Sequence, residues 1–283
     1  MKKNSIYLLL LTFVLVAGCD RIERDEYMVA SSGSGSNGQW TNGGVQRALV
    51  EKYTGPRCNN CPLADETLDA LHEQYASELV IIAITPYNNI MADPFPNQLD
   101  PRTTVGTTWA EHFGISGLPS ACINRDRSTL YDGAMENIGS AIAGVIAGEP
   151  MIGLNLSIEA DTASRTLDIT AAVDVYNTIT DELTLTLVLT EDSLRYRQLS
   201  PEGIKNDYVH NHMLREAITA TWGEAIPLAG TPGEHKEKHF VYTVADPTIN
   251  LMNSNVVGFI ARKSDRTVLN SQEVQIFTHP IEN

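Results

Sequence analysis

The stretch that decides the fold is Thr54-Gly55-Pro56-Arg57-Cys58-Asn59-Asn60-Cys61-Pro62, which carries two cysteines three positions apart. A strand-like run, Val45–Tyr53, precedes it, and apolar residues at helical spacing follow it over Ala64–Tyr75. A helix can begin at Pro62, because the first helical N–H groups have no intrahelical partner and proline lacks only that group. The pattern predicts a strand, a tight turn bearing a C-x-x-C pair, and a helix starting beside the second cysteine.

The cysteine pair is open to three kinds of chemistry: a structural disulfide, a metal site, or thiol–disulfide exchange with a partner. A structural zinc site usually needs a second ligand pair at matching spacing, and the sequence has none. Two histidine pairs, His210 with His212 and His235 with His239, are expected to be hydrogen-bonded or surface side chains rather than metal ligands. We therefore predict no metal and no cofactor, and keep a brace and a redox site as alternatives.

The N-terminal segment predicts export and a lipid anchor. Lys2 and Lys3 precede an apolar run, Ile6–Val16, which is too short to span a bilayer. Small residues then lead to Cys19, and this run resembles a bacterial lipobox, in which cleavage precedes the cysteine and the cysteine is acylated. Residues 1–18 are accordingly predicted to be a signal peptide with Cys19 lipidated. The alternative is an ordinary secretory signal with an incidental cysteine.

The chain is strongly acidic, and a polar tether precedes the first strand. The formal net charge of -15 argues against nucleic acid as a partner. Ser31–Gly44 is rich in Ser, Gly and Asn and cannot bury enough apolar surface to order itself, so we predict that residues 19–44 form a flexible, lipidated tether. The chain would then contact the membrane through its N-terminal lipid. We expect it at the outer membrane, with the periplasmic and surface faces left open.

Residues 45–149 alternate strands and helices. Leu79–Thr85 is a short apolar run rich in branched residues, which predicts a strand buried on both faces. Because a strand–helix–strand order needs a crossover, this strand is expected to lie parallel to the one before the cysteines, in an α/β domain. Further along the chain we predict a helix over Thr103–Phe113, a strand over Ser120–Asn124 and a helix over Ala134–Ala147.

From residue 150 to 283 the hydrophobic period changes to two. Apolar residues alternate with polar ones in several runs, which predicts short strands with one buried face. Val256–Arg262 and Val268–Ile276 flank a polar turn and predict a hairpin. We therefore predict an all-β, immunoglobulin-like antiparallel sandwich over 150–283, with Ser193–Thr231 as a long loop or short helix.

The segment LVEKYTGPRCNNCP, the helix and buried strand after it, and FGISGLPS resemble the thioredoxin-like fold over Val45–Glu149. The resemblance implies that Pro119 is a cis-proline beside the cysteines. A cysteine at a helix N-terminus has its thiolate stabilised by the helix dipole, and Arg57 adds a nearby positive charge. Cys58 would then be the exposed nucleophile and Cys61, one turn in, the resolving thiol. A permanent Cys58–Cys61 disulfide that braces the loop is the alternative.

Glu51 and Cys122 complete the set of candidate site residues. In thioredoxin-like enzymes an acid in the strand beneath the cysteines relays protons, and Glu51 matches that position if one extra residue precedes Cys58. Buried there, Glu51 would act as the base for Cys61; the alternative is an exposed or salt-bridged glutamate. Cys122 follows Pro119 in an expected central strand and is predicted to be a buried, inert thiol.

Taken whole, the chain resembles the outer membrane protein 28 family of bacterial lipoproteins. The points of match are the lipobox cysteine, EKYTGPRCNNCP, FGISGLPS, the DYVHNHMLR segment (Asp207–Arg215) and the β-rich second half. The resemblance implies an outer-membrane lipoprotein with a thioredoxin-like domain and leaves two functions open. One is thiol–disulfide exchange on exported proteins or peptides. The other is non-enzymatic binding or adhesion, with the thioredoxin-like domain as a scaffold.

Overall fold

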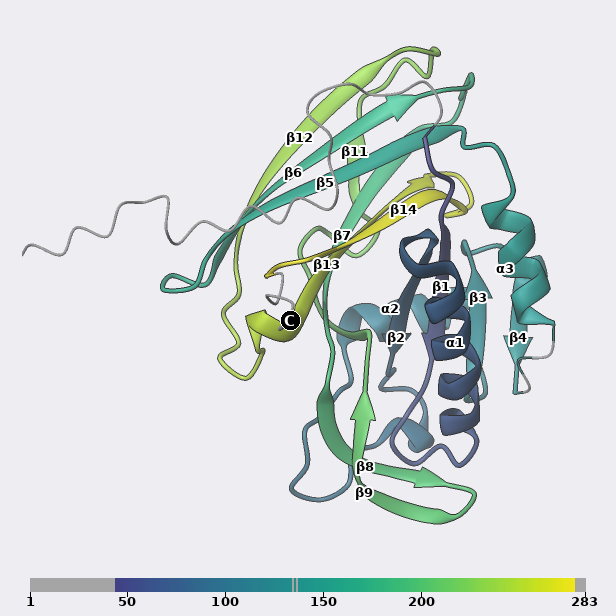
Figure 1. Ribbon diagram of the computed structural model, residues 1–283, viewed down its shortest axis with the longest axis vertical. Helices are drawn as coiled ribbons and strands as arrows, with labels where there is room; N and C mark the ends of the chain where they lie inside the picture. Colours follow the sequence, from purple (N-terminus) through teal and green to yellow (C-terminus); the bar gives the residue numbers. More distant parts are fainter. Residues whose placement is uncertain (1–43, 134, 136, 278–283) are drawn as a thin grey trace, which may run out of the picture.

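The computed structural model describes residues 44–133, 135 and 137–277, and the fold in this range is β-rich (Figure 1). The predicted signal peptide, Cys19 and the tether up to residue 43 lie outside the described residues, so they stay predictions. Among the helices of the described range, none combines the length and the apolar character that crossing a membrane requires.

Strand β1 (Ala48–Tyr53) lies at the centre of the first half. It pairs in parallel with β2 (Leu79–Ile84) and antiparallel with β3 (Ser120–Ile123), and all of its residues are buried. Helix α1 (Cys61–Tyr75) is the crossover between β1 and β2, which confirms the predicted parallel pair and the helix after the cysteines. The helix begins at Cys61, so the second cysteine is its first residue.

Helices cover both faces of this part of the sheet. Successive residues of β1 point to opposite faces, so neighbouring residues pack against different helices. Val50 packs on the face covered by α1 and α3 (Ile138–Ile146). Leu49 packs on the other face, against α2 (Thr104–Phe113). The shorter elements of this half are β4 (Leu130–Asp132), which pairs with β3, and the 3-10 helices η2 (Ala76–Glu78), η3 (Ile90–Ala92) and η4 (Arg127–Thr129).

The sheet continues from the first half into the second. Among the described residues its order is β14-β13-β7-β10-β2-β1-β3-β4, with β11 added beside β7. Strand β10 makes the link, because Met213 pairs with Ala83 and the Ala83 N–H donates to the carbonyl oxygen of His212 at 2.8 Å. A strand pair therefore crosses the predicted domain boundary at 149/150, and the division into domains stays a prediction. The added elements are β7 (Leu183–Glu191), β10 (Met213–Ala217), β11 (Glu224–Ile226), η5 (Leu251–Asn253), β13 (Ser254–Arg262) and β14 (Val268–Gln275).

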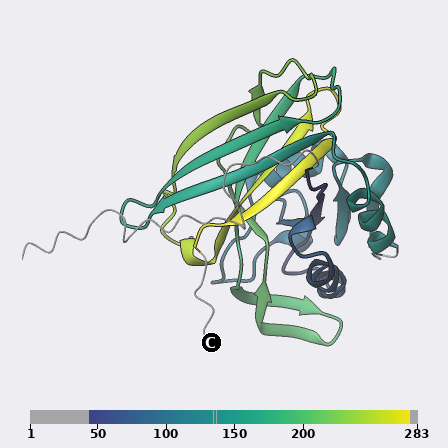
Figure 2. The ribbon, with the colours of Figure 1, turned by 45° about the horizontal axis from the view of Figure 1, so that its top comes forward.

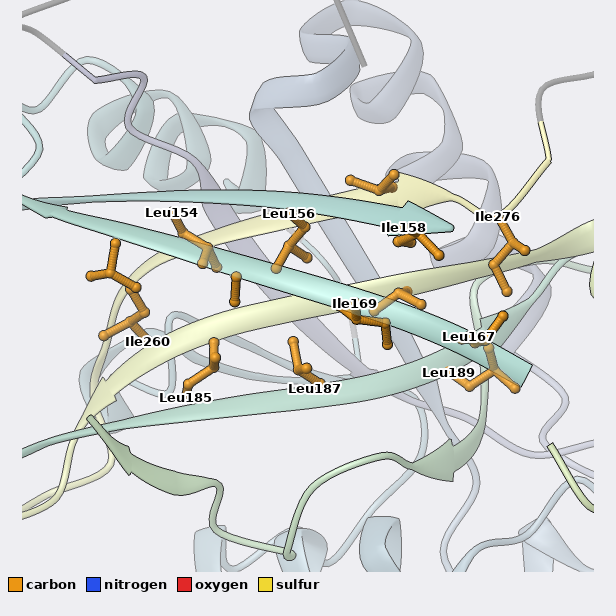
Figure 3. Close-up of a cluster of buried hydrophobic side chains, with 14 of the residues drawn as sticks. Leu154, Leu156, Ile158, Leu167, Ile169, Leu185, Leu187, Leu189, Ile260 and Ile276 are labelled. Carbon is orange, nitrogen blue, oxygen red and sulfur yellow. The ribbon is translucent and has the colours of Figure 1, made fainter. Parts of the chain in front are cut away.

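A separate antiparallel sheet packs over the β14–β13–β7 part of the first. It consists of β5 (Ile152–Asp161), β6 (Thr166–Val175) and β12 (His235–Thr243). Along β5, buried and exposed residues alternate, as the sequence period predicts. Figure 3 shows leucine and isoleucine side chains from both sheets meeting between them, Leu156 and Leu187 among them. The β-rich second half and the β13–β14 hairpin are confirmed.

The segment Ser193–Thr231 is not the long loop or short helix that we predicted from the sequence, because it holds strands β8 to β11. Strands β8 (Leu194–Ser200) and β9 (Gly203–His210) pair only with each other among the described residues, and we call this hairpin the arm. The arm lies at the lower end of the molecule in Figure 1 and in the turned view of Figure 2, far from the β5–β6–β12 sheet. Most of β9 is exposed, so it lacks the apolar alternation of a half-buried strand.

Candidate functional site

Cys58 and Cys61 are joined in a disulfide where β1 passes into α1. The intervening loop is tied to a neighbouring segment, because the Arg57 N–H donates to the carbonyl oxygen of Met91 at 2.9 Å. Cys61 begins α1, where unpaired N–H groups and the helix dipole favour a thiolate. The pair therefore has the local geometry that its sequence context predicts.

The Arg57 side chain forms no hydrogen bond to the cysteines, beside which we expected its positive charge. It is exposed, and its Nε and Nη2 atoms donate to the carbonyl oxygens of Asp93 and Pro94, each at 3.0 Å. Its guanidinium lies 5.2 Å from the centre of the Phe95 ring. The Arg57 guanidinium thus binds residues 93–95 and not Cys58.

Both cysteines are buried, each with 1% of its surface exposed. Our expectation that Cys58 is exposed is therefore wrong for this arrangement of the chain. Gln198, on the inner strand of the arm, packs against the loop that carries them, and its side-chain Nε2 donates to the carbonyl oxygen of Cys58 at 2.9 Å and to that of Gly55 at 3.2 Å. Gln198 is itself only 1% exposed. No periodicity or motif links these positions, so reasoning from the sequence missed the contact.

A main-chain hydrogen bond continues the contact between the arm and the cysteine loop. The Leu199 N–H donates to the carbonyl oxygen of Pro56 at 2.8 Å. Strand β8 thus donates to three carbonyl oxygens of the loop, those of Gly55, Pro56 and Cys58. The carbonyl oxygens of Gly55 and Cys58 also accept main-chain N–H groups within the loop, at 3.0 Å from Cys58 and at 3.4 Å from Cys61. Burial without the Leu199 N–H would leave the Pro56 carbonyl unpaired, which is costly.

Pro119 lies at the same edge of the sheet as the cysteine loop. The Leu118–Pro119 peptide bond is cis, as the resemblance implied. The next residue, Ser120, pairs with Tyr53, the last residue of β1, so the two segments leave the sheet side by side. The carbonyl oxygen of Pro119 accepts the N–H of Gly133 at 2.8 Å. Pro119 therefore lies at the edge of the sheet from which the cysteine loop also leaves.

Glu51 is on the other face of the sheet from α1. It shares the face of Leu49, toward α2, and its buried carboxylate accepts Arg125 Nη2 at 2.6 Å and Nε at 3.0 Å. The Arg125 guanidinium also lies 4.3 Å from the Trp109 ring and 4.5 Å from the Phe259 ring. The salt-bridged alternative is therefore the one present, and Glu51 is not a base for Cys61, because its carboxylate is paired on the opposite face.

A polar cluster that the sequence did not reveal lies on the α1 face instead. Lys52, the neighbour of Glu51, forms an ion pair with Asp65, which also accepts the Tyr208 hydroxyl at 2.9 Å. Asp65 is four residues after Cys61 on α1, so the two side chains share one helix face. Lys52 and Asp65 were visible as a strand residue and an early helical acid, but nothing in the sequence indicated Tyr208.

His210 is the last residue of β9, at the base of the arm, and lies next to this cluster. Its ring stacks on the Tyr196 ring with 3.5 Å between centres and meets Tyr208 edge-on at 4.9 Å. Its Nε2 atom is buried and has no protein partner. Burial lowers the pKa of His210 to about 3, against an opposing charge effect of Asp65. His210 is therefore a neutral packing residue at neutral pH.

Cys122 is a buried free thiol, as predicted. It pairs across the sheet with Glu51, and its Sγ atom lies 3.4 Å from the carbonyl oxygen of Asp126. Burial raises the pKa of Cys122 to about 12, with the Glu51 charge adding to the effect. A thiol that stays protonated is neither a good nucleophile nor a good metal ligand.

The four histidines considered as metal ligands are not brought together. His235 pairs with Asp174 at 2.8 Å on the β6–β12 sheet, where His239 is exposed. His210 and His212 lie at the base of the arm instead. Within the described part of the chain, no group of three His, Cys, Asp or Glu side chains is arranged to hold a metal ion.

Comparison with solved structures defines the class of protein. HBP35 of Porphyromonas gingivalis aligns with a TM-score of 0.67 and 17% identity over 85% of this chain and 78% of that chain. A protein from Agrobacterium tumefaciens aligns with a TM-score of 0.51 and 13% identity over 84% of this chain and 98% of that one. At these identities the likeness shows the fold alone. The class is thus a β-rich fold with mixed and antiparallel sheets, here carrying a buried disulfide at a helix start.

The family follows from the sequence match. The model of the family described as outer membrane protein Omp28 matches residues 107–279, more than half of the chain, and the chain belongs to that family. Membership confirms the predicted outer-membrane localisation and agrees with the predicted lipid anchor. The match begins after Cys61, so it carries no information on the cysteine pair.

Two further comparisons add little to this assignment. A domain of the outer membrane lipoprotein Omp28 from Porphyromonas gingivalis aligns at 18% identity over 45% of this chain and 88% of that chain, and its TM-score of 0.33 carries no argument about the fold. Among curated proteins, none matches the sequence.

Proposed function

We propose that the chain is an outer-membrane lipoprotein that exchanges thiols and disulfides with exported proteins through Cys58 and Cys61. In this proposal residues 45–149 form a thioredoxin-like unit, and residues 150–283 form an immunoglobulin-like sandwich joined to it. The observation that carries the proposal is the Cys58–Cys61 disulfide with Cys61 as the first residue of α1. The cis Leu118–Pro119 bond at the same sheet edge supports it.

The two cysteines account for every bond and electron in the exchange. In the reduced form the Cys58 thiolate attacks one sulfur of a substrate disulfide and expels the other as a thiolate. Cys61 then attacks the Cys58 sulfur of the mixed disulfide, which frees the second substrate thiolate and restores the Cys58–Cys61 bond. Two electrons and two protons have passed to the substrate. The reverse sequence oxidises a substrate dithiol. Glu51 has no step, because Arg125 occupies its carboxylate.

Burial of the pair favours a second candidate function. A disulfide that is 1% exposed and clamped by Gln198 suits a permanent brace. The chain would then be a non-enzymatic binding or adhesion lipoprotein, with the partner contacted by the rest of its surface.

One variant separates the two candidates. With Cys61→Ser in the full lipoprotein, expressed in its own compartment, a reactive Cys58 should accumulate as mixed disulfides with exported proteins, because no resolving thiol is present. The matched control is Cys122→Ser, which removes the free thiol and keeps the pair, and which should trap nothing. Purified wild-type protein should also reduce a fluorescent peptide disulfide catalytically when a dithiol is supplied.

The redox proposal is overturned if the Cys61→Ser variant traps no protein and the wild type gives no turnover of the peptide disulfide above that of Cys58→Ser. That result, together with a loss of stability on replacing both cysteines, would support the brace.

A further inference from the structure

We propose that the inner strand of the arm, β8, occupies the surface on which a substrate polypeptide binds beside the Cys58–Cys61 disulfide, and that exchange requires the arm to leave. This inference rests on the proposed thiol–disulfide exchange. It goes beyond that exchange by assigning a docking surface, the chemistry of its occupant and the segment that blocks it.

The disulfide cannot react with a protein thiol in the closed arrangement. Exchange needs an attacking sulfur to reach one of the two disulfide sulfurs directly. Cys58 and Cys61 are each 1% exposed, and Gln198, which is itself buried, bonds the carbonyl oxygens of Gly55 and Cys58. Access must therefore come from movement of the segment that covers the loop.

The arm is a separable element. Its two strands pair with each other and with no other strand in the described range, and a hairpin of this kind is marginally stable alone. Its two connections to the large sheet contain non-glycine residues in left-handed conformations, Ser193 with φ 59° and His212 with φ 58°. The closed position therefore depends on side-chain contacts and single hydrogen bonds to the body rather than on pairing with a strand of the large sheet.

The contacts beside the disulfide are polar, and at the base of the arm the stacked rings of Tyr196 and His210 are buried. Gln198 and Leu199 bond the cysteine loop, and Tyr208 on the outer strand donates to Asp65, one helical turn after Cys61. Each such hydrogen bond is replaced by one to water when the arm leaves, so its net contribution is small. Opening the arm is thus far less costly than unfolding the sheet.

The exposed surface would select an occupant that donates hydrogen bonds. Without β8, the carbonyl oxygens of Gly55, Pro56 and Cys58 face outward beside the disulfide, and all are acceptors. Strand β8 meets them with one main-chain N–H and one side-chain amide. An extended polypeptide that carries a cysteine offers the same donors along its main chain. Its thiolate then attacks a sulfur of the disulfide, a mixed disulfide forms, and the other cysteine leaves as a thiolate.

Weakening the closed arm should speed reduction of the disulfide by a small dithiol. In the full mature protein, Gln198→Ala removes both side-chain bonds to the loop and should raise the rate of reduction by dithiothreitol about tenfold. Tyr208→Phe removes the contact to Asp65 and should raise it by a smaller factor. Ile204→Thr, at a 53% exposed position on the outer strand, is the matched control and should leave the rate unchanged. Equal rates in wild type, Gln198→Ala and Tyr208→Phe would overturn the covering role.

The docking surface is tested with a pair of peptides. A cysteine peptide without proline should form a mixed disulfide with Gln198→Ala several-fold faster than its twin N-methylated on the amides flanking the cysteine, because only the first donates main-chain N–H groups. Dithiothreitol gives the reference rate for each protein. Equal rates for the two peptides overturn the docking surface.

The two proposals fail in distinguishable ways. The covering role and the peptide preference are read from the rate at which one disulfide opens, with no catalytic turnover needed. The Cys61→Ser variant could trap no protein in the cell while Gln198→Ala and Tyr208→Phe still speed reduction by dithiothreitol. That result would reject thiol–disulfide exchange as the function, and with it the substrate assigned to the surface.

Discussion

The side-chain amide of Gln198 donates to the carbonyl oxygen of Cys58 at 2.9 Å, although 140 positions separate the two residues. This bond joins the β-rich second half of the chain to the loop that holds the disulfide. Because Gln198 is 1% exposed, its two acceptors have no water to replace it while the arm is closed. The predictions below follow from this contact and from the buried ionisable side chains of the same half of the molecule.

Gln198→Glu should destabilise the protein more at neutral pH than Gln198→Ala. A carboxylate at this position would face the carbonyl oxygens of Cys58 and Gly55 with no donor, which costs about 1–3 kcal/mol in addition to the lost bonds. Urea unfolding relative to wild type at each pH measures the effect. Near pH 4 the protonated carboxyl can donate again, so the gap to wild type should narrow. A gap that is constant with pH would contradict this account.

Breaking the Glu51–Arg125 ion pair should cost about 3–5 kcal/mol, because either single change leaves a buried charge unpaired. Glu51→Gln and Arg125→Met test this by urea unfolding, and the double variant should lose less than the sum. The exposed Arg195–Asp207 pair is the control, and its removal should cost less than about 1 kcal/mol. Additive losses at Glu51 and Arg125 would show that the two side chains act independently.

Acid should weaken the fold through His210. Burial lowers its pKa from 6.5 in the unfolded chain to about 3 in the folded one, so the unfolded chain binds a proton first as the pH falls. Stability from this group is complete above pH 6.5 and declines toward pH 3, by up to about 1.4 kcal/mol per pH unit. His210→Phe keeps a ring against Tyr196 and should flatten the decline measured by urea unfolding between pH 7 and 4. An unchanged slope in this variant would rule out His210 as the cause.

Cys122 should resist alkylation in the folded protein. Burial raises its pKa to about 12, so almost no thiolate is present at pH 8, and the side chain is 1% exposed. Iodoacetamide followed by mass spectrometry of the Cys122 peptide should find label only after denaturation. Rapid labelling of the native protein would mean that β3 opens readily. The same experiment in the Cys61→Ser variant should label Cys58 before Cys122.

Much of the first half was predictable from local patterns. The apolar runs around the cysteines predicted β1, α1 and β2, and a strand–helix–strand order requires the parallel pair that is found. Local patterns could not tell which face of the sheet the Glu51 side chain is on. Its neighbours Val50 and Lys52 face α1, and a shift of one residue along a strand moves a side chain to the opposite face of the sheet.

The arm shows why the candidate site was only half predictable. Strand β9 is exposed over most of its length, so its sequence has no regular alternation of apolar and polar residues. Without that pattern we predicted a loop or short helix for this segment. The cover over the cysteines depends on Gln198, a residue type that occurs on any polar surface. Its role arises only because β7 and β10 place the base of the arm beside β2.

The sequence by itself predicted an export signal, and it determined the acidic charge, the C-x-x-C pair and the change from helical to strand periodicity. These are local properties, since a period of 3.6 or two residues, a proline in a first turn or a run of small residues acts within a few positions. Only the tertiary structure decided that Arg125 pairs with Glu51 and that Gln198 closes the loop of Cys58 and Cys61. Such contacts depend on strand order and register across the whole sheet, which local preferences do not specify.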